Sequence, residues 1–385
     1  MEEINRTIDK IRILMNDLIK DAASLPPISL KTATEYHNNI YNMTTYVNSI
    51  LTTTPNIYEI IGNNPLGIMY DNHKHHAAFM STVFSISNYE LLARTAPWVY
   101  RSYYSHGFDF DYFLIELNSW KEAINQYLDK KYADEINRIY DWLIDRHADI
   151  ISIALSDIEC ALPIDEKWLE SKNSFQSALL DGDHKKALSI AQNSIKNQSD
   201  LQNFYLHIIQ PSMYEIGMMW ERAEISVAQE HLASAIVGRI MASVSMMGKD
   251  GKIDKSSGKA IVTASPNEFH EIGAWMIADT LEQDGWDVRY LGANMPKEDL
   301  IIFIQSFIPD LLAISVTMPF NLSYAKEVIS KMRGDEKMKN IKVMVGGRVF
   351  NENPKLWEST GADGYAPNLE EAKYLAKRLI NIVSQ

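Results

Sequence analysis

From Lys259 onward the sequence alternates short apolar segments with longer amphipathic ones, and this alternation constrains the fold more than any other feature. The apolar segments occupy residues 260–264, 287–290, 311–315 and 342–345, and the amphipathic segments occupy residues 271–284, 297–307, 322–332 and 353–359. Strands that are apolar along their whole length are typical of parallel sheets covered by helices on both faces. Residues 258–385 are therefore predicted to form an α/β domain with a doubly wound, Rossmann-like sheet of the flavodoxin type. In such a sheet ligands bind beyond the carboxyl ends of the strands.

Residues 163–248 are predicted to form four shorter helices, over residues 166–180, 184–196, 201–222 and 227–246. Short polar turns between the helices favour antiparallel neighbours, so we expect a four-helix bundle. Ser226 and Gln229 form the capping-box pattern at the start of the last helix. The stretch from residue 248 to residue 258 is rich in Gly, Lys, Asp and Ser and is interpreted as a linker to the α/β domain.

Residues 1–162 are predicted to form an all-helical domain of about globin size. Apolar residues recur at helical spacing, most clearly in residues 111–127 and 134–153, and segments typical of strands are nearly absent. Turn-forming residues predict helix ends at Pro26–Pro27, at Pro55–Asn56, at residues 63–65 and at residues 95–97.

Composition excludes several classes of function. The formal net charge is −13 without a concentrated run of Lys and Arg, which argues against direct nucleic-acid binding. No apolar run is long enough to span a bilayer, and the N-terminus is predicted to be a charged amphipathic helix rather than a signal peptide, so we expect a cytoplasmic protein. The single cysteine, Cys160, excludes an intrachain disulfide and Cys-cluster metal sites, and we expect it to be a small core residue.

His270 follows the first predicted strand of the sheet in the pattern Glu268-x-His270-x-x-Gly273. A neutral imidazole can bind a metal through one ring nitrogen while the other donates to a carboxylate, and Glu268 is the candidate acceptor. Gly273 lies at the start of the next predicted helix. Taken alone, the pattern also fits an ordinary loop histidine that binds nothing.

Small and hydroxyl side chains follow two further strands. Between Gly273 and Ser315-x-Thr317 there are 41 residues, and between Thr317 and Gly346-Gly347 there are 28 residues. By themselves the first pair is a common strand ending and the second a common tight turn. Because parallel strands end at the same edge of a sheet, we expect all these residues to surround one slot.

At their joint spacing the three motifs resemble those of corrinoid-binding modules. The resemblance implies a cobalamin-binding domain in which the nucleotide tail of the cofactor leaves cobalt, inserts into the slot and is replaced by the protein histidine. It implies His270 as the lower cobalt ligand. The other cofactor-binding residues that it implies here are Glu268, Gly273, Ser315, Thr317, Gly346 and Gly347.

A second element, Trp220-x9-Glu230-His231, lies in the predicted bundle. By residue type alone Trp220 is expected in a core, whereas Glu and His are rarely buried without partners. The tight turn between the two helices allows all three side chains to face one cavity. The element resembles the cap of the CarH-type light-sensing adenosylcobalamin proteins, which implies that these residues, with Val227, cover a 5'-deoxyadenosyl group above cobalt.

One position departs from the CarH-type pattern. Those proteins have a histidine directly after the tryptophan, and it binds cobalt once light has expelled the adenosyl group. This chain has Glu221 there. A bis-histidine state formed in that way is therefore in doubt; His231 could substitute only if its helix shifted, and water is the simpler sixth ligand.

The N-terminal domain concentrates histidine, aromatic and arginine side chains, and the candidate ligand-binding residues are His73, His75, His76, Trp98, Arg101 and Tyr104. Such side chains suit a planar tetrapyrrole with propionates, because rings line its faces while Arg and Tyr bind carboxylates. The layout resembles the photocobilins, photoreceptors that pair a cobalamin module with a globin-like domain holding biliverdin. Two alternatives stay open: core aromatics with solvated histidines, and a haem globin that uses one of the histidines.

Together the resemblances imply a light sensor rather than an enzyme, with adenosylcobalamin between the bundle and the α/β domain and biliverdin in an all-α, globin-like N-terminal domain. Light would break the cobalt–carbon bond, move the bundle and change the association of subunits in a homo-oligomer. The output protein is not identified by the sequence. The alternatives are a corrinoid methyl carrier of a methyltransferase system, which shares the last two domains, and a haem-globin sensor fused to a cobalamin module.

Overall fold

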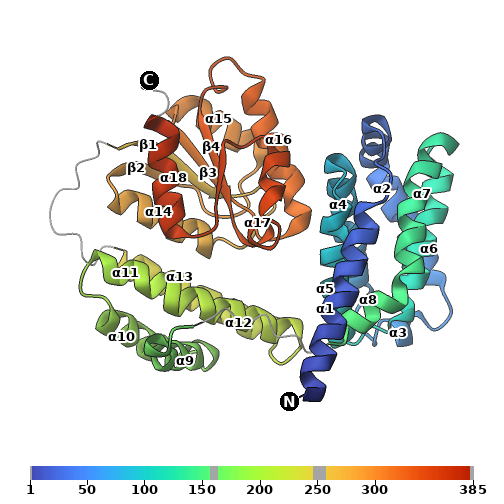
Figure 1. Cartoon of the computed structure of the whole chain (residues 1–385), viewed down its shortest axis with the longest axis horizontal. Helices are drawn as coiled ribbons and strands as arrows, with labels where there is room; N and C mark the ends of the chain where they lie inside the picture. Colours follow the sequence, from blue (N-terminus) through green and yellow to red (C-terminus); the bar gives the residue numbers. More distant parts are fainter. Residues whose placement is uncertain (1, 157–163, 246–256, 382–385) are drawn as a thin grey trace. The chain divides into compact units, whose positions relative to one another are not determined.

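Figure 1 shows the computed structural model, which describes residues 2–156, 164–245 and 257–381. The described residues form two compact units. The first holds residues 2–156 together with Glu221–Ala223, and the second holds the other described residues. Cys160 and residues 248–256 of the predicted linker lie outside the described residues.

The first unit is built from helices, as predicted. In chain order they are α1 (Glu2–Ala23), α2 (Leu30–Thr53), α3 (Ile57–Ile60), α4 (Leu66–Ile86), α5 (Tyr89–Ser105), α6 (Asp111–Tyr127), α7 (Lys130–Asp145) and α8 (His147–Ala154). Helix α2 packs against α4 and α6, while α1 and α8 pack against α5. The largest fully buried side chains of this unit include Tyr36, Tyr112, Trp120 and Tyr140, so its core is aromatic and partly polar.

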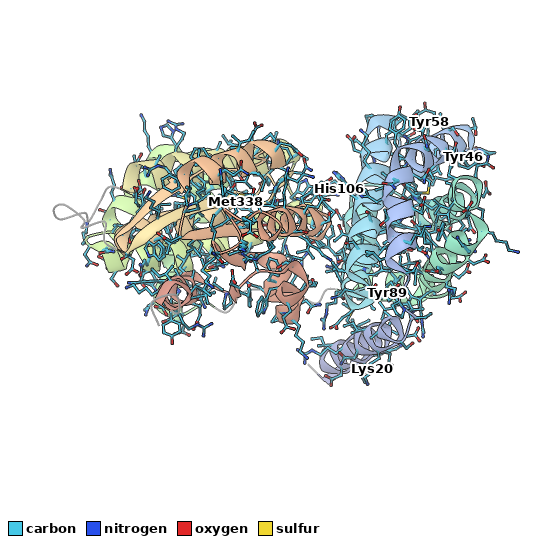
Figure 2. The ribbon with its side chains drawn as sticks, turned by 90° about the horizontal axis from the view of Figure 1, so that it is seen from above. Lys20, Tyr46, Tyr58, Tyr89, His106 and Met338 are labelled. Atoms are coloured by element: carbon cyan, nitrogen blue, oxygen red, sulfur yellow. The ribbon has the colours of Figure 1, made fainter. Side chains whose placement is uncertain are left out.

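The turn between α1 and α2 is held by Tyr89 at the start of α5, a side chain that Figure 2 labels. The backbone N–H of Ile28 donates to the Tyr89 hydroxyl at 3.2 Å, and that hydroxyl donates to the carbonyl of Pro26 at 3.4 Å. This turn falls at the predicted Pro26–Pro27 break. The breaks predicted at Pro55–Asn56 and at residues 63–65 also lie between helices.

The helix end predicted at residues 95–97 is wrong, because α5 continues through it with Pro97 in its interior. A proline inside a helix removes one backbone hydrogen bond, but Pro97 is buried in a helix that packs against α1 and α8, and tertiary packing overrides local propensity. The chain breaks instead before α5. Ser87 adopts a left-handed φ of 49°, and Asn88 caps α5 by accepting a hydrogen bond from the Leu91 N–H.

The second unit begins with the predicted helical bundle. Its elements are α9 (Glu166–Leu180), α10 (His184–Ser194), α11 (Gln198–Phe204), the π-helical turn η1 (Tyr205–Ile209), α12 (Gln210–Glu221) and α13 (Val227–Val244). Because α11, η1 and α12 follow one another without a break, they form the one long helix that was predicted at this point. The capping box of Ser226 and Gln229 at the start of α13 is confirmed.

The π-helical turn lies where the bundle meets the α/β domain. The hydroxyl of Tyr205, its first residue, donates to the carboxylate of Asp279 on α14 (Ile272–Gln283) at 2.5 Å. The ring of His207 stacks on Trp168 of α9 with 5.4 Å between ring centroids. Further along, Gly238 of α13 lies next to the ring of Trp275 on α14. The bundle therefore packs on the sheet domain through α14.

The α/β domain has the predicted parallel sheet, with strand order β2-β1-β3-β4-β5. The strands are β1 (Gly258–Ala264), β2 (Trp286–Tyr290), β3 (Leu311–Ser315), β4 (Lys342–Gly346) and β5 (Gly364–Ala366). The further helices are α15 (Lys297–Phe307), α16 (Leu322–Arg333), α17 (Arg348–Glu352) and α18 (Leu369–Asn381). This is the flavodoxin-type order, in which the chain reverses direction across the sheet between β1 and β3.

The two faces of the sheet have separate helix layers (Figure 1). Alternate residues of β1 and β3, such as Val262 and Ala313, form one core with α14 and α18. Their neighbours Ile261 and Leu312 are also buried and, by the two-residue repeat of a strand, point to the opposite face. The strands are therefore apolar along nearly their whole length because both faces of the sheet are covered, as predicted.

The C-terminal end of the sheet domain differs from the prediction. Residues 353–359 are not an α-helix but part of a 3₁₀ helix, η3 (Pro354–Thr360), after the short α17. Pro354 cannot continue an α-helix, which explains the break. Strand β5 and helix α18 then complete the domain and were not predicted. In the described parts of the chain, no helix is long and apolar enough to cross a membrane.

Candidate functional site

The carboxyl ends of β1, β3 and β4 lie side by side. Ala264 pairs with Ser315, and Ser315 pairs with Gly346. The backbone continues this pairing beyond the strands, since Ser265 N donates to the Ser315 carbonyl at 2.9 Å and Val316 N donates to the Gly346 carbonyl at 2.9 Å. The three predicted motifs therefore meet at the point where the strand order reverses, which is where sheets of this class bind ligands.

Glu268, in the loop after β1, is the centre of a buried hydrogen-bond network. One carboxylate oxygen, Oε2, accepts from Thr317 N at 3.0 Å, from Met318 N at 2.8 Å and from Asn321 Nδ2 at 3.1 Å. The other oxygen, Oε1, lies 2.5 Å from Nδ1 of His270. Burial alone raises the pKa of Glu268, but the hydrogen bond and charge of His270 and the donors of Met318 and Asn321 outweigh it and lower the pKa. The carboxylate is therefore held in its charged form.

His270 is oriented by this carboxylate. A carboxylate can only accept, so the proton of the imidazole lies on Nδ1 and the lone pair of Nε2 is left for a ligand. The side chain is 57% exposed, so Nε2 is within reach of a bound group. Burial lowers the pKa of His270, whereas Glu268 raises it more, and the charge of Glu230 acts in the same direction. The imidazole is thus a stronger base than an isolated histidine.

The glycines of the site differ in whether neighbouring atoms of the protein leave room for a Cβ. A Cβ on Gly347 would lie 2.3 Å from the Val316 carbonyl oxygen, and Gly347 has a φ of 107°. A Cβ on Gly346 would lie 2.9 Å from the Ala366 carbonyl oxygen. The fold itself therefore requires this pair. At Gly273 the nearest atom to such a Cβ is Ser315 Oγ at 3.8 Å, an ordinary contact, so no neighbour within the chain requires glycine there.

Ser315 and Thr317 are half-buried beside this glycine, at the end of β3 and two residues beyond it. Gly273 lies in the first turn of α14 and is exposed. Small side chains from three elements thus line the edge of the sheet near His270. The slot residues predicted from the sequence are brought together by the fold.

The four predicted cap residues come from the end of α12 and the start of α13. Trp220 is half-buried against the bundle core. Val227 is 53% exposed, and Glu230 lies one turn further along α13. Glu230 Oε1 accepts from Ser234 Oγ at 2.8 Å, and Glu230 Oε2 lies 2.7 Å from Nδ1 of the exposed His231. Because the charge of Glu230 acts on His270, the start of α13 and the loop after β1 belong to one electrostatic environment.

The candidate tetrapyrrole residues of the first unit fall into two groups. His73 is buried, with Nδ1 2.5 Å from Asn48 Oδ1, and burial lowers its pKa to about 3. His76 lies one turn further along α4, stacks on Trp120 and has Nε2 3.0 Å from the Tyr140 hydroxyl. His75 between them is exposed. Both inward-facing imidazoles therefore belong to the interior of the unit.

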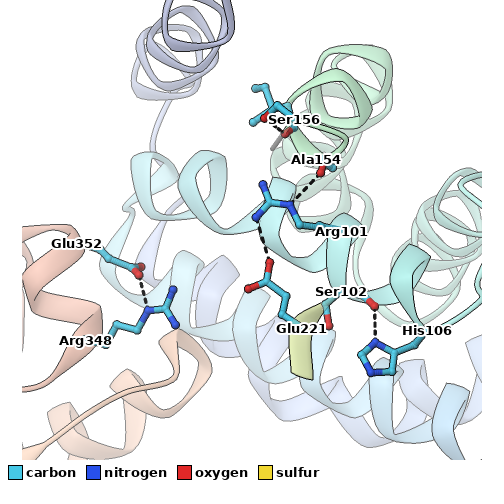
Figure 3. Close-up of polar contacts among 9 residues, drawn as sticks. Arg101, Ser102, His106, Ala154, Ser156, Glu221, Arg348 and Glu352 are labelled. Carbon is cyan, nitrogen blue, oxygen red and sulfur yellow. Dashed lines mark hydrogen bonds and ion pairs between the residues drawn. The ribbon is translucent and has the colours of Figure 1, made fainter. Parts of the chain in front are cut away.

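The second group lies on α5, where Trp98, Arg101 and Tyr104 are spaced three residues apart and so share one side of the helix. Arg101 Nε donates to the Ala154 carbonyl at 2.8 Å, and Arg101 Nη1 donates to Glu221 Oε1 at 3.0 Å (Figure 3). Tyr104 is 48% exposed and stacks on Phe110 with 4.4 Å between ring centroids. Arg101 thus already binds a carboxylate, that of the residue at which the chain departs from the CarH-type pattern.

Two functional candidates were missed from the sequence. Glu116 on α6 is buried, accepts from Trp120 Nε1 at 3.2 Å and lies 3.8 Å from His76 Nδ1. Its position on the apolar side of a predicted amphipathic helix was the available signal. Asn321 follows β3 at some distance from the Ser-x-Thr motif, and no local pattern indicated that it would reach Glu268.

Comparison with known proteins assigns the cofactor. Residues 258–373 match a protein family described as B12 binding domain, and residues 172–244 match a second family with the same description. Dimethylamine corrinoid protein 1 of Methanosarcina acetivorans is 23% identical over 197 residues, which cover 51% of this chain and 91% of that protein. The HTH-type transcriptional repressor CarH of Myxococcus xanthus is 25% identical over 151 residues, which cover 39% of this chain and 49% of the repressor.

Among solved structures, the monomethylamine corrinoid protein of Methanosarcina barkeri is 21% identical, with a TM-score of 0.46, and the match covers 55% of this chain and 99% of that one. The two family matches span the bundle and the α/β domain, which pack together through α14. The chain is therefore a cobalamin-binding protein that carries two B12-binding domains.

Proposed function

We propose that this protein is a light sensor that binds adenosylcobalamin, with His270 as the lower cobalt ligand and the start of α13 as the cap of the upper face. The observation that carries the proposal is the pairing of an oriented imidazole on the sheet domain with a carboxylate on the bundle whose charge acts on it. A ligand bound between these two groups would meet the basic nitrogen of His270 on one side and the hydrogen-bond-accepting carboxylate of Glu230 on the other.

The residues present fit a corrinoid. Across residues 2–156, 164–245 and 257–381, no three His, Cys, Asp or Glu side chains converge as a metal site. A single imidazole with a free Nε2 fits a metal whose other ligands arrive with a macrocycle. Gly273 fits as well, because a glycine that no protein atom requires leaves room for the nucleotide tail beside Ser315.

Adenosylcobalamin, when bound, supplies a cobalt–carbon bond that light breaks. The chain's own residues position and protect it. Glu268 holds the proton of His270 on Nδ1, so that Nε2 stays available as a ligand. Trp220 and Val227 would supply apolar surface that excludes water from the bound group, and Glu230 would act as a hydrogen-bond acceptor for it.

The last residue of α12 connects this cap to the signal. Glu221, which follows Trp220 directly, binds Arg101 and belongs to the first unit. A displacement of Trp220 would be passed to Glu221 through the covalent chain, and from there to Arg101. We propose that the signal is read as a change in subunit association or by an output protein, and that the chain is not itself an enzyme.

We further propose that the first unit is globin-like and holds biliverdin, with the candidate residues on α4 and α5 as its partners. The aromatic and imidazole side chains of these helices support a planar, hydrogen-bonding ligand. A haem bound to one of the histidines is the alternative for this unit.

A second function is favoured by the similarity to dimethylamine corrinoid protein 1, most of whose length is matched by this chain. In that case the protein would be a corrinoid methyl carrier of a methyltransferase system. The carrier function uses His270 equally well, but it gives no role to an apolar and acidic cap or to the first unit.

The deciding experiment is to load the full chain with adenosylcobalamin or with methylcobalamin in the dark, and then to illuminate each sample. A light sensor should prefer the adenosyl form, and its absorption spectrum and oligomeric state should both change on illumination. Equal affinity for the two forms, with no change of oligomeric state in light, would support the carrier instead.

A further inference from the structure

We infer that a contact between Arg348 and Tyr214 slows the release of cobalamin, because it holds the bundle against the sheet domain beside the proposed cofactor site. Arg348 directly follows Gly347 and is the first residue of α17, whereas Tyr214 lies on α12, six residues before Trp220. The inference rests on the proposed site between the bundle and the carboxyl ends of the strands, and it holds for a light sensor and for a methyl carrier alike.

The first argument is the geometry of the contact. The guanidinium carbon Cζ of Arg348 lies 5.8 Å from the centroid of the Tyr214 ring, within the range of a cation–π interaction. Glu352, one turn further along α17, restrains the guanidinium by accepting from Arg348 Nε at 2.6 Å (Figure 3). Burial raises the pKa of Tyr214, and the positive charge of Arg348 acts in the opposite direction. The ring and the charge therefore act on each other.

The second argument is the position of the contact. On the sheet side, Arg348 follows the carboxyl end of β4 closely, and its charge acts on His270. On the bundle side, Gly217 lies one turn after Tyr214 and so on the same side of α12. Within the described residues, a Cβ on Gly217 would have no heavy atom within 4 Å beyond its own stretch of helix. Tyr214 therefore borders a part of α12 that the protein itself leaves uncovered.

The third argument is the contrast with a second contact of the same continuous helix. Tyr205, the first residue of η1, donates to Asp279 on α14 at 2.5 Å, and both side chains are buried. Along the helix axis the two tyrosines are about 13 Å apart. A buried hydrogen bond to a carboxylate contributes more than the cation–π contact of an arginine whose side chain is 41% exposed. The bundle can therefore separate from the sheet domain near Tyr214 while it stays attached at Tyr205.

The consequence concerns the rate of cofactor release. A ligand bound between the bundle and the sheet domain leaves when the two separate, so a contact that opposes the separation slows dissociation. We expect the loss of this contact to speed dissociation about two- to fivefold, which corresponds to about 0.5–1 kcal/mol at 1.36 kcal/mol for each factor of ten.

The test measures how fast the full chain releases cobalamin in the dark. The protein is loaded with radiolabelled adenosylcobalamin, an excess of unlabelled cofactor is added, and the label that stays on the protein is followed by filtration. Arg348→Met and Tyr214→Leu should each release the label about two to five times faster than the wild type. Arg348→Lys keeps a cation and Tyr214→Phe keeps a ring, so both should stay close to the wild type. The double variant Arg348→Met/Tyr214→Leu should be no faster than either single variant, because the two side chains form one contact.

Arg289→Met is the matched control. The side chain of Arg289 is about as exposed as that of Arg348 and also lies over an aromatic ring, that of Phe307 at 4.8 Å, but this contact lies within the sheet domain. Its loss should leave the release of cobalamin unchanged. The inference is overturned if either Arg348→Met or Tyr214→Leu releases cobalamin at the wild-type rate, or if Arg289→Met speeds release equally.

If Tyr214→Leu does not fold, the comparison of Arg348→Met with Arg348→Lys decides by the same rate. The absorption spectrum of the bound cobalamin should stay that of the wild type in every variant, since none of the changes replaces His270. A changed spectrum in Arg348→Met would mean that Arg348 acts on the cobalt ligand rather than through Tyr214, and would overturn the inference. Failure of the proposed site is separate, because it would appear as a His270→Ala variant whose cobalamin spectrum is unchanged.

Discussion

The buried carboxyl of Glu116 should make the stability of this protein depend on pH in a specific way. Burial among α2, α4, α6 and α7 raises the pKa of Glu116 to about 7 from the ordinary value of 4.5, although its hydrogen bond from Trp120 acts in the opposite direction. A group whose pKa is raised in the folded state stabilises the fold while it is protonated. That stabilisation is fully present below the unfolded pKa and is lost as the pH rises through the folded pKa.

The magnitude follows from the shift. The pKa of Glu116 in the folded state, about 7, exceeds the ordinary value of 4.5 by about 2.5. At about 1.36 kcal/mol for each tenfold change in proton affinity, this difference corresponds to about 3 kcal/mol of stability, lost between about pH 4 and about pH 8. Other groups titrate over part of this range in the opposite sense. Burial lowers the pKa of His73 and of His76 to about 3 and also lowers the pKa of His75, His147 and His207, so the contribution of these histidines is lost as the pH falls. The effect of Glu116 must therefore be measured as a difference between two proteins.

The assay is urea unfolding of the wild type and of Glu116→Gln across this pH range, followed by circular dichroism. At the acid end both should have similar free energies of unfolding, and at the alkaline end the wild type should have lost about 3 kcal/mol relative to the variant. Glu122→Gln, on an exposed position of the same helix, is the matched control and should follow the wild type. Parallel curves for the wild type and Glu116→Gln would refute the argument that burial keeps this carboxyl protonated.

Four further predictions concern the ligand sites. His270→Ala should lose the absorption spectrum of histidine-ligated cobalamin and bind it about 10- to 100-fold more weakly, whereas His184→Ala at the start of α10 should not; an unchanged spectrum would rule out His270 as the ligand. Trp220→Ala should reduce the preference for adenosylcobalamin over methylcobalamin, with Trp168→Ala as the tryptophan control, and a preference that survives would remove Trp220 from the cap. Gly273→Leu should fold normally, since a Cβ has room there, yet weaken cobalamin binding by about tenfold or more. Gly347→Ala should instead destabilise the fold by about 1–3 kcal/mol. Equal effects of the two substitutions on stability in urea unfolding would contradict the distinction between the two glycines. With biliverdin, the full chain should show a long-wavelength absorption band that Arg101→Gln or His76→Gln weakens; a sharp haem band instead would favour the haem alternative.

The sequence predicted the parts of the fold that depend on periodicity. The apolar strands and the bundle helices have lengths and repeats that few other folds satisfy, and the structure confirms them nearly residue by residue. The prediction failed where tertiary packing overrides local chemistry. Pro97 is an ordinary helix breaker, but burial of α5 keeps it inside a helix. Strand β5 has only three residues and gives too short a pattern to recognise.

The site was predictable to the extent that its residues follow strand ends. Topology brings such residues to one edge of the sheet, so the motifs of β1, β3 and β4 could be grouped without knowing any distance. The partners that orient them could not be found in the same way. Asn321 reaches Glu268 from a turn whose course depends on packing. In the first unit, the helical repeat places Glu116 on the apolar side of its helix but does not show that it contacts His76. Hydrogen bonds between residues that are distant in the sequence leave no periodic pattern from which they could be predicted.

The π-helical turn Tyr205–Ile209 sets the direction in which Trp220 points. A π-turn contains one residue more than the α-helical turn it replaces, and one residue corresponds to about 100° of rotation around the axis. The one extra residue, about three turns before Trp220, therefore sets the angular position of every side chain of α12 around the helix axis. Deleting Leu206 would restore a regular helix and swing Trp220 away by roughly a quarter of a revolution, with no change in any residue at the site. The direction in which an aromatic side chain at the end of a helix points can thus depend on the length of that helix rather than on the identity of its residues.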